Sequence, residues 1–412
     1  MFSTSNDRRY FSDPRDFSRN GPLTPELLVT LLVYMVADGN RRGYQHLLDG
    51  FWDEARSYGL ELPTEGPISA ASFCTARHKI TPELLRNMLH DIASAFETTF
   101  ESQRWFGRRV FAIDGAKINL QRGDDLEAAF GVPEGAYCPQ VLVSVLLDVC
   151  AKAPVDVEVS PFASSEREHL HNMLSSLGRG DVLVLDRGYP SHDVLQTLVQ
   201  EGIDFLVRVP STHTFAAIDE LRESDGDDFL YYVDPPKGSP REWSRLTLRA
   251  IRLKNAGGEE SFYFTTLGRK HFSLARIREL YHMRWEAEEF YKLLKGPYIG
   301  QGQFRSKSPV GIEQEIRALV LFLAIARVLM ATAADVCGVD FPSLSQKAAV
   351  LGLADYVTRL FLSTDSDYAR GELQALLKRI ARTPYKRRPD RTFPRVSFKP
   401  RLRWGPSGRC GG

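Results

Sequence analysis

Two short apolar runs that each finish on an aspartate constrain the fold of this chain most strongly. Residues 110–114 read Val-Phe-Ala-Ile-Asp, and residues 181–186 read Asp-Val-Leu-Val-Leu-Asp. A run of this length and composition, bounded by turn-forming residues, predicts a strand that is buried in a sheet. A carboxylate beside such a strand is costly unless a positive charge compensates it. Asp114 and Asp186 are therefore candidates for a functional site.

The order of the predicted elements indicates the fold class. Strands are predicted at 109–114, 141–149 and 155–159, then a helix introduced by Ser165 to Glu168 in a capping-box pattern, a strand at 181–186, a helix near Ser191 and a strand at 205–209. Three consecutive strands followed by alternating helix and strand is the order of a ribonuclease H-like core. We therefore predict an α/β fold with a ribonuclease H-like catalytic core, flanked by helical N- and C-terminal regions.

The segments around this core have patterns of their own. Apolar residues at helical spacing after Thr24-Pro25 predict helices through residues 24–100, either as a plain helical bundle or as a module that binds duplex DNA. Residues 211–267 alternate like strands and interrupt the order of the core, which predicts a β-rich insertion. One long helix is expected from about Ser273 to Leu294, and further helices from Ile312 onward.

Charge is distributed unevenly along the chain. The formal net charge of +1 over 412 residues does not by itself indicate a nucleic-acid-binding protein. However, twelve Lys or Arg residues stand against one acid, Asp390, between Lys378 and Arg409. Four prolines interrupt this segment before Trp404, so we expect an extended basic tail. It would serve either as a non-specific phosphate binder or as a solubilising tail.

Cysteine usage and hydropathy exclude several classes. The five cysteines include no C-x-x-C pair, which argues against a zinc site or a disulfide framework and suits a reducing cytoplasm. Residues 1–20 are polar and lack the apolar core of a signal peptide. The most apolar stretch, Ala318 to Ala331, is broken by Arg327 and is too short to span a bilayer. We expect a buried helix there and no association with a membrane.

A third acid lies on the helix predicted over residues 281–295. At about 100° per residue, Tyr281, Arg284, Glu288 and Lys295 share an arc of roughly 60°, whereas the apolar residues form a separate stripe. Glu286 and Glu289 point away from this polar line, so Glu288 is the candidate. For this helix in isolation, an ordinary surface ion pair between Arg284 and Glu288 is the alternative interpretation. If Glu288 meets the two aspartates, the trio could hold Mg²⁺, which prefers carboxylate and phosphate oxygens.

These motifs together resemble the DDE transposases of bacterial insertion sequences, in particular the family of insertion sequence four. The family signature Tyr-x2-Arg-x3-Glu-x6-Lys is met without a gap by Tyr281, Arg284, Glu288 and Lys295. The first acid occurs as Asp114-Gly115 and the second within the tetrapeptide at 186–189, Asp-Arg-Gly-Tyr. The β-rich insertion between the second and third acids is also typical of the family. The resemblance extends over about residues 10–400.

The resemblance implies roles for individual residues. Asp114, Asp186 and Glu288 would be the catalytic residues and the ligands of Mg²⁺, for which Mn²⁺ would substitute. Tyr281, Arg284 and Lys295 would contact DNA phosphates, and the chemistry of these side chains suits that task. Further candidate DNA-binding residues are Arg187, Tyr189, Arg305 and Lys307. The chain departs from many relatives at Ala116, where they have Thr, which removes a hydroxyl but no ligand.

The sequence thus predicts a cut-and-paste DNA transposase of a bacterial insertion sequence. Residues 1–104 would bind the element ends, residues 105–310 would form the catalytic domain around the insertion at 211–267, and residues 311–382 and 383–412 would form a helical region and the basic tail. The expected partners are the inverted-repeat ends, target DNA and a second copy of the chain, in a cytoplasmic, nucleoid-associated setting. Two alternatives stay open: a non-catalytic repressor that binds DNA ends, and a ribonuclease H-like nuclease that cuts without joining.

Overall fold

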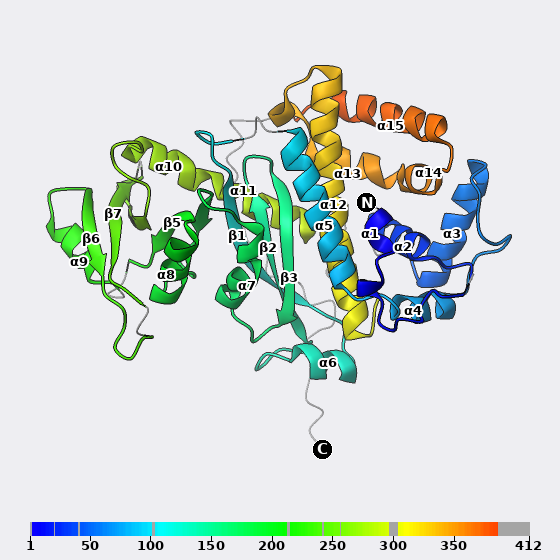
Figure 1. Ribbon diagram of the computed structural model, residues 1–412, viewed down its shortest axis with the longest axis horizontal. Coiled ribbons are helices and arrows are strands. Elements are labelled where there is room, and N and C mark those ends of the chain that lie inside the picture. Colours follow the sequence, from blue (N-terminus) through cyan, green and yellow to red (C-terminus); the bar gives the residue numbers. More distant parts are fainter. Residues whose placement is uncertain are drawn as a thin grey trace.

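The protein is elongated, with a wide β-sheet toward one end and a bundle of helices toward the other (Figure 1). The structure is a computed structural model that describes residues 2–19, 21–39, 42–100, 104–211, 215–240, 243–255, 257–295 and 304–385. The basic tail predicted from residue 383 therefore lies almost entirely outside the described residues, as does most of the glycine-rich loop before Phe304.

A single sheet of eight strands forms the centre of the α/β part, in the order β3-β2-β1-β4-β5-β8-β7-β6. Its strands are β1 (Val110–Asn119), β2 (Gln140–Asp148), β3 (Ala153–Pro161), β4 (Val182–Leu185), β5 (Asp204–Val209), β6 (Asp228–Val233), β7 (Leu246–Lys254) and β8 (Glu260–Thr265). Strands β1 to β3 pair antiparallel, while β4 and β5 run parallel to β1. The chain is thus an α/β protein whose core strands follow one another in the predicted order.

Two features of the sheet differ from the sequence prediction. Strand β1 continues to Asn119 instead of ending at Asp114, because Ala116 and Ile118 keep the inward apolar alternation after the continuous apolar run has stopped. The predicted β-rich insertion contains three strands, β6 to β8, and in addition the helix α9. Strand β8 pairs antiparallel with β5, so β6 to β8 extend the core sheet at one edge.

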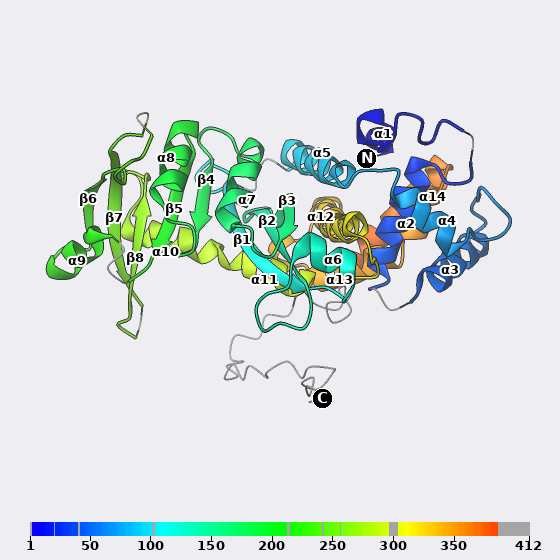
Figure 2. The same cartoon turned by 90° about the horizontal axis from the view of Figure 1, so that it is seen from below.

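Helices cover both faces of the sheet (Figure 2). On one face lie α7 (Glu166–Met173), α8 (His192–Glu201) and α9 (Ala216–Glu223), whose apolar side chains pack on the same cluster as Phe111 and Leu183. On the other face lie α10 (Leu274–Met283) and α11 (Trp285–Leu294). The predicted capping box of α7 is present at Ser165 and Glu168. The single long helix predicted from Ser273 is divided at Arg284, a residue that stays in the right-handed helical region at the junction.

The remaining helices build the second part of the molecule. They are α1 (Phe2–Ser5), α2 (Pro25–Ala37), α3 (Tyr44–Ser57), α4 (Ala70–Arg77), α5 (Glu83–Thr99), α6 (Asp124–Phe130), α12 (Pro309–Cys337), α13 (Gln346–Ala354), α14 (Val357–Leu362) and α15 (Ser366–Ala381), with short 3-10 turns at Arg8–Tyr10, Leu174–Ser176 and Phe341–Ser343. Thr24 caps α2 through its side chain, as the Thr-Pro start signal predicted.

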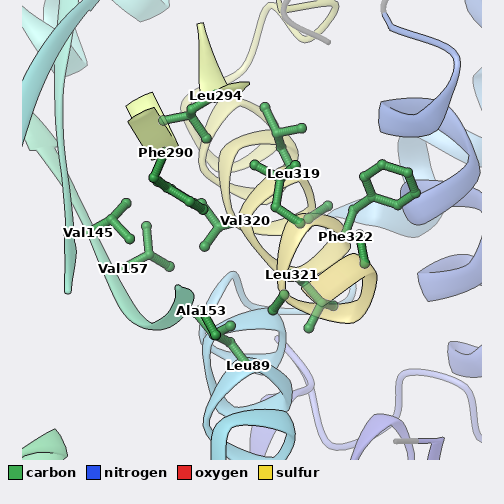
Figure 3. Close-up of a cluster of buried hydrophobic side chains, with 14 of the residues drawn as sticks. Leu89, Val145, Ala153, Val157, Phe290, Leu294, Leu319, Val320, Leu321 and Phe322 are labelled. Carbon is green, nitrogen blue, oxygen red and sulfur yellow. The ribbon is translucent and has the colours of Figure 1, made fainter. Parts of the chain in front are cut away.

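Helix α12 joins the two parts of the molecule. It packs against α2, α5, α13, α15 and β3. Its Val320 side chain points toward Val145 and Val157 of the sheet, whereas Phe322 points to the other side of the helix, all within one apolar cluster (Figure 3). At 29 residues it is longer than the predicted apolar stretch, and by length and composition it could cross a membrane. Since 72% of its most apolar window is buried inside the protein, α12 is accounted for as a core helix.

Buried charges fix the N-terminal helices to α12. The Arg77 guanidinium forms an ion pair with Glu315 at 3.1 Å and donates to the Gln314 side chain at 3.1 Å. The Tyr44 hydroxyl also bonds to Glu315, so each charge in this cluster has a partner. The cluster holds residues of α4 and α12, far apart in the sequence, in one rigid arrangement.

Candidate active site

Asp114 and Asp186 follow the paired parts of two neighbouring parallel strands, β1 and β4. The strand order of the sheet reverses between these two strands, because β2 and β3 continue on the other side of β1. Strand β1 pairs with β4 in the register Val110 with Val182 through Ala112 with Val184. Two residues beyond the last of these pairs, on the same face of each strand, stand Asp114 and Asp186. In sheets of this type, ligands bind outside the carboxyl ends of the parallel strands at such a reversal.

The edge of β1 beyond Asp114 is open on the β4 side. Strand β4 ends at Leu185, and β1 continues to Asn119 while pairing only with β2. Side chains from both faces of the sheet can therefore approach β1 along this edge. The position is unusual for a carboxylate, because the strand residues just before it are fully buried.

Each aspartate is oriented by one short backbone contact. The Gly188 N–H donates to Asp186 Oδ1 at 2.6 Å, and the Gly115 N–H donates to Asp114 Oδ1 at 3.1 Å. Burial raises the pKa of Asp114 to about 6, and the nearby carboxylates of Glu166 and Asp186 add to the increase, while Arg284 and the Gly115 N–H oppose it. The negative form of Asp114 is therefore under-compensated in the protein as it stands.

Tyr291, a buried residue about one helical turn after Glu288 on α11, holds that helix against β1. The Tyr291 hydroxyl on α11 donates to the Asp114 carbonyl oxygen at 2.6 Å and accepts from the Val145 N–H at 3.0 Å. Asp114 and Val145 are register partners of β1 and β2, so this hydroxyl bridges the two strands at the aspartate itself. It fixes α11, and with it Glu288, against the site.

Arg284 lies among the three acids. Its guanidinium donates to Glu288 Oε1 at 2.5 Å, and its side chain is only 16% exposed. Burial alone would lower the pKa of Arg284, but Tyr281 and the charges of Glu288, Asp114 and Asp186 raise it. The ion pair considered as an alternative from the sequence is thus present, but it is part of the acid cluster and not an isolated surface pair. As the sequence predicted, Glu286 and Glu289 turn elsewhere, to Lys152 and Lys292.

The donor set suits a hard divalent cation. All three acids offer carboxylate oxygens, and a cation would compensate the buried charge of Asp114. Within the described parts of the chain, however, no three Asp, Glu, His or Cys side chains converge into a group that could hold a metal ion as they stand. Binding of a cation therefore requires these carboxylates to move closer together, and Glu288 would have to turn away from Arg284.

Comparison with known proteins places this geometry in a family. Residues 105–325, more than half of the chain, match the family described as Transposase DDE domain. The chain belongs to this family. All three acids, Asp114, Asp186 and Glu288, lie within the matched range.

Two individual proteins are also similar. The chain is 27% identical over 104 residues to the Putative transposase InsZ of Escherichia coli (strain K12), a match that covers 24% of this chain and 34% of InsZ. The matched segment thus spans about a third of the length of that relative. A solved structure, the piggyBac transposase synaptic complex with hairpin DNA, overlaps 90% of this chain and 84% of its own with a TM-score of 0.46 at 11% identity.

Several of the predicted DNA-binding side chains border the acids. Tyr281 and Arg284 are in cation–π contact at 5.8 Å from guanidinium carbon to ring centroid, and both are half-buried. Lys295 is exposed at the far end of α11, with its Nζ 5.6 Å from the Tyr291 ring centroid. Arg187 is exposed directly after the second acid, and Lys307 is exposed before α12. The exposed side chains of Lys295, Arg187 and Lys307 are accessible to a phosphate.

Two other predicted DNA-binding residues are buried. The Tyr189 side chain is 0% exposed and packs in the core beneath α7 and α8. The Arg305 guanidinium is 8% exposed, pairs with Asp38 at 2.9 Å and donates to the carbonyl oxygens of Met35 and Arg42. Neither group can reach DNA in this conformation, so we leave both out of the DNA-binding set proposed below. Their sequence context, a polar turn and a Gly/Ser loop, gave no sign of this burial.

Sequence reasoning missed two residues of the site. Tyr291 was counted with neither the polar nor the apolar line of its helix, although a hydroxyl at i+3 from Glu288 was a usable signal. Glu166 was interpreted as part of a helix-capping motif alone. The structure brings its carboxyl against β1 beside Asp114, a proximity that depends on how α7 packs on the sheet.

Proposed function

We propose that the protein is a DNA transposase that cuts the ends of its element and joins them to target DNA. The observation that carries this proposal is the adjacency of Asp114 and Asp186 at the β1/β4 reversal, with Glu288 delivered over them by α11. Membership of the DDE family supports the chemistry. The ribonuclease H-like core and the insertion sequence four signature are part of the same proposal.

In this proposal the three acids hold Mg²⁺, or Mn²⁺ in its place. The bound cation would activate the attacking oxygen and stabilise the charge on the leaving oxygen during phosphodiester cleavage. Arg284 then has two partners: Glu288 in the protein alone and a DNA phosphate in the complex. A guanidinium suits both, since it offers several donors in a planar fork to either anion.

DNA would lie along the open edge of β1. Tyr281, Lys295, Arg187 and Lys307 would contact the backbone of the bound end. Hydrolysis would leave a 3′-hydroxyl, which then attacks a phosphodiester of the target DNA. We also propose that a dimer bridges the two ends and that the protein acts in the cytoplasm.

The experiment uses purified protein, Mg²⁺ and a plasmid that carries the DNA flanking this reading frame. Excision and strand joining are measured for the wild type, for Glu288→Gln and for Glu289→Gln, a matched change one residue along the same helix. We expect Mg²⁺-dependent excision and joining that only Glu288→Gln abolishes. Cutting without joined products would favour the nuclease, and tight binding of the ends without cutting would favour the repressor.

A further inference from the structure

Glu166 is the first residue of α7, and the start of this helix is fastened to the loop that carries the second acid. The Arg167 guanidinium donates twice to the Gly188 carbonyl oxygen, at 3.1 and 2.9 Å. The Ser165 hydroxyl caps the helix, and the Glu168 carboxylate completes the cap. Glu166 itself takes no part in the capping box, so its carboxyl is free for another task.

The Glu166 carboxyl rests directly on the β1 backbone beside the first acid. A Cβ atom added to Gly115 would lie only 2.6 Å from Glu166 Oε1 and 2.7 Å from Cγ. Any other residue at this position would displace the carboxyl. Glu288 belongs to α11 and Glu166 to α7, and these two helices lie on opposite faces of the sheet (Figure 2).

The surroundings of Glu166 leave its charge without a close positive partner. Among the described residues no ion pair within 4 Å involves Glu166, and Lys117 acts on it only at longer range. The Tyr189 hydroxyl is completely buried next to the carboxyl and makes no hydrogen bond of ordinary geometry in the described chain.

Helix stability does not account for this arrangement. An acid in the first turn interacts favourably with the helix dipole, but Glu168 already fills that role and makes the capping contact. A position in the first turn also does not require the side chain to fold back onto the one glycine beside Asp114.

We propose that Glu166 is a fourth acid of the site, a carboxylate that turns toward the divalent cation when Asp114 and Asp186 bind it, since among the described residues no three such side chains converge on one point as they stand. The inference rests on the proposed function and deepens it. Gly115 has no side chain, so the Glu166 carboxyl can lie against the β1 backbone at that position. Tyr189 would donate a hydrogen bond to the Glu166 oxygen that does not face the cation. With Glu166 included, the cation is approached from both faces of the sheet.

The test measures Mn²⁺ binding to the full chain without DNA, by titration calorimetry or by the loss of the free-ion paramagnetic resonance signal. Glu166→Gln is compared with Glu168→Gln, which removes the same charge two residues away and keeps a capping-box acceptor. We expect Glu166→Gln to weaken Mn²⁺ binding by roughly 10- to 100-fold, the range typical of altered metal-site support, and Glu168→Gln to leave it unchanged. Gly115→Ala should weaken binding as well, because it pushes the carboxyl away without removing it.

Mn²⁺ binding by the Asp114→Asn variant shows whether a negative result for Glu166 concerns Glu166 alone or the proposed cation site as a whole. If Asp114→Asn weakens Mn²⁺ binding and Glu166→Gln leaves it within twofold of wild type, Glu166 is not a ligand and only the present inference is overturned. If neither change weakens binding, no cation site exists at this edge, and the proposed function falls with it. Unchanged thermal unfolding of Glu166→Gln would establish that any loss reflects the ligand and not the fold.

Discussion

The half-buried Asp114 on β1 and the fully buried Asp156 on β3 belong to one sheet but differ in how far neighbouring groups compensate their charge. On β3, Asp156 receives the Arg86 guanidinium at 2.7 and 3.0 Å and the Ser176 hydroxyl at 2.8 Å. On β1, Asp114 receives one backbone N–H, and its nearest cation, Arg284, is bonded to Glu288. Burial alone would raise the pKa of Asp156, yet His90 and Arg86 lower it to about 2, whereas burial raises the pKa of Asp114 to about 6.

The difference separates structural from functional charge. Asp156 fastens α5 to the sheet, and its charge is neutralised by groups that the fold supplies. The Arg77–Glu315 pair does the same for α4 and α12. Around Asp114 the carboxylates outnumber the nearby cations, a condition that costs stability unless an added cation relieves it. Uncompensated charge of this kind is a recognised mark of functional sites.

Removal of the structural aspartate gives the largest expected effect on folding. Asp156→Ala leaves the Arg86 guanidinium with Glu158 as its remaining partner, and we expect a loss of about 3 kcal/mol in the free energy of unfolding. Asp114→Asn removes a poorly compensated charge and should leave that free energy equal or higher. Urea denaturation in the presence of EDTA measures both. An equal loss in the two variants would remove the distinction between the two aspartates.

The pH dependence of stability should distinguish the same two groups. The pKa of Asp114 is raised in the folded protein, to about 6, so its penalty is fully present above pH 6 and disappears as the pH falls toward its unfolded value near 4. The lowered pKa of Asp156 stabilises the fold above pH 4 and loses that effect as the pH falls toward 2.

Other groups titrate in the same window, so the informative quantity is a difference between two proteins. His169 is buried, which lowers its pKa to about 4 and makes the fold less stable as the pH falls from 6.5 to 4. Subtracting the Asp114→Asn profile from that of the wild type cancels His169. We expect the wild type to gain on the order of 1–3 kcal/mol relative to the variant between pH 7 and pH 4 without metal. A flat difference would mean that Asp114 is already compensated.

The smallest expected effect concerns two basic residues close together in the sequence. Lys307 is exposed and Arg305 is paired with Asp38, so Lys307→Ala should weaken DNA binding slightly and lower the salt dependence by about one phosphate contact. Arg305→Ala should instead lower the free energy of unfolding, since Asp38 keeps only Arg42 as an ionic partner and the carbonyl oxygens of Met35 and Arg42 lose a donor. Filter binding at several salt concentrations and urea denaturation check the two outcomes. A lower salt dependence in Arg305→Ala, at unchanged stability, would contradict the assignment.

Much of the scaffold of the site could be predicted from local pattern. The apolar runs before Asp114 and Asp186, and the helical spacing of Glu288, depend on neighbours in sequence, and the strands and helices were expected close to where they lie. Contacts between distant segments could not be predicted in this way. The approach of Glu166 to Gly115, the burial of Tyr189 and the Arg305–Asp38 pair each join elements far apart in the chain.

The placement of Tyr291 shows the limit most clearly. Its side chain lies between the polar and apolar faces of α11, so the helix pattern alone assigns it to neither. Its role depends on the register of β1 and β2, because its hydroxyl bonds to the Asp114 carbonyl oxygen on β1 and to the paired Val145 N–H on β2. The prediction of one unbroken helix through Arg284 was wrong at that residue, where the sequence contains no Gly or Pro to mark the division between α10 and α11.

Iron-mediated cleavage of the polypeptide would test most directly whether Asp114, Asp186 and Glu288 form one cation site. Fe²⁺ bound in place of Mg²⁺, with ascorbate and peroxide, cuts the backbone close to the bound ion, and the fragments are mapped by mass spectrometry. We expect cuts clustered near residues 114, 186 and 288, suppressed by excess Mg²⁺ and absent in Asp114→Asn. Cuts confined to other segments, or a pattern unchanged in Asp114→Asn, would contradict a shared site at the end of β4.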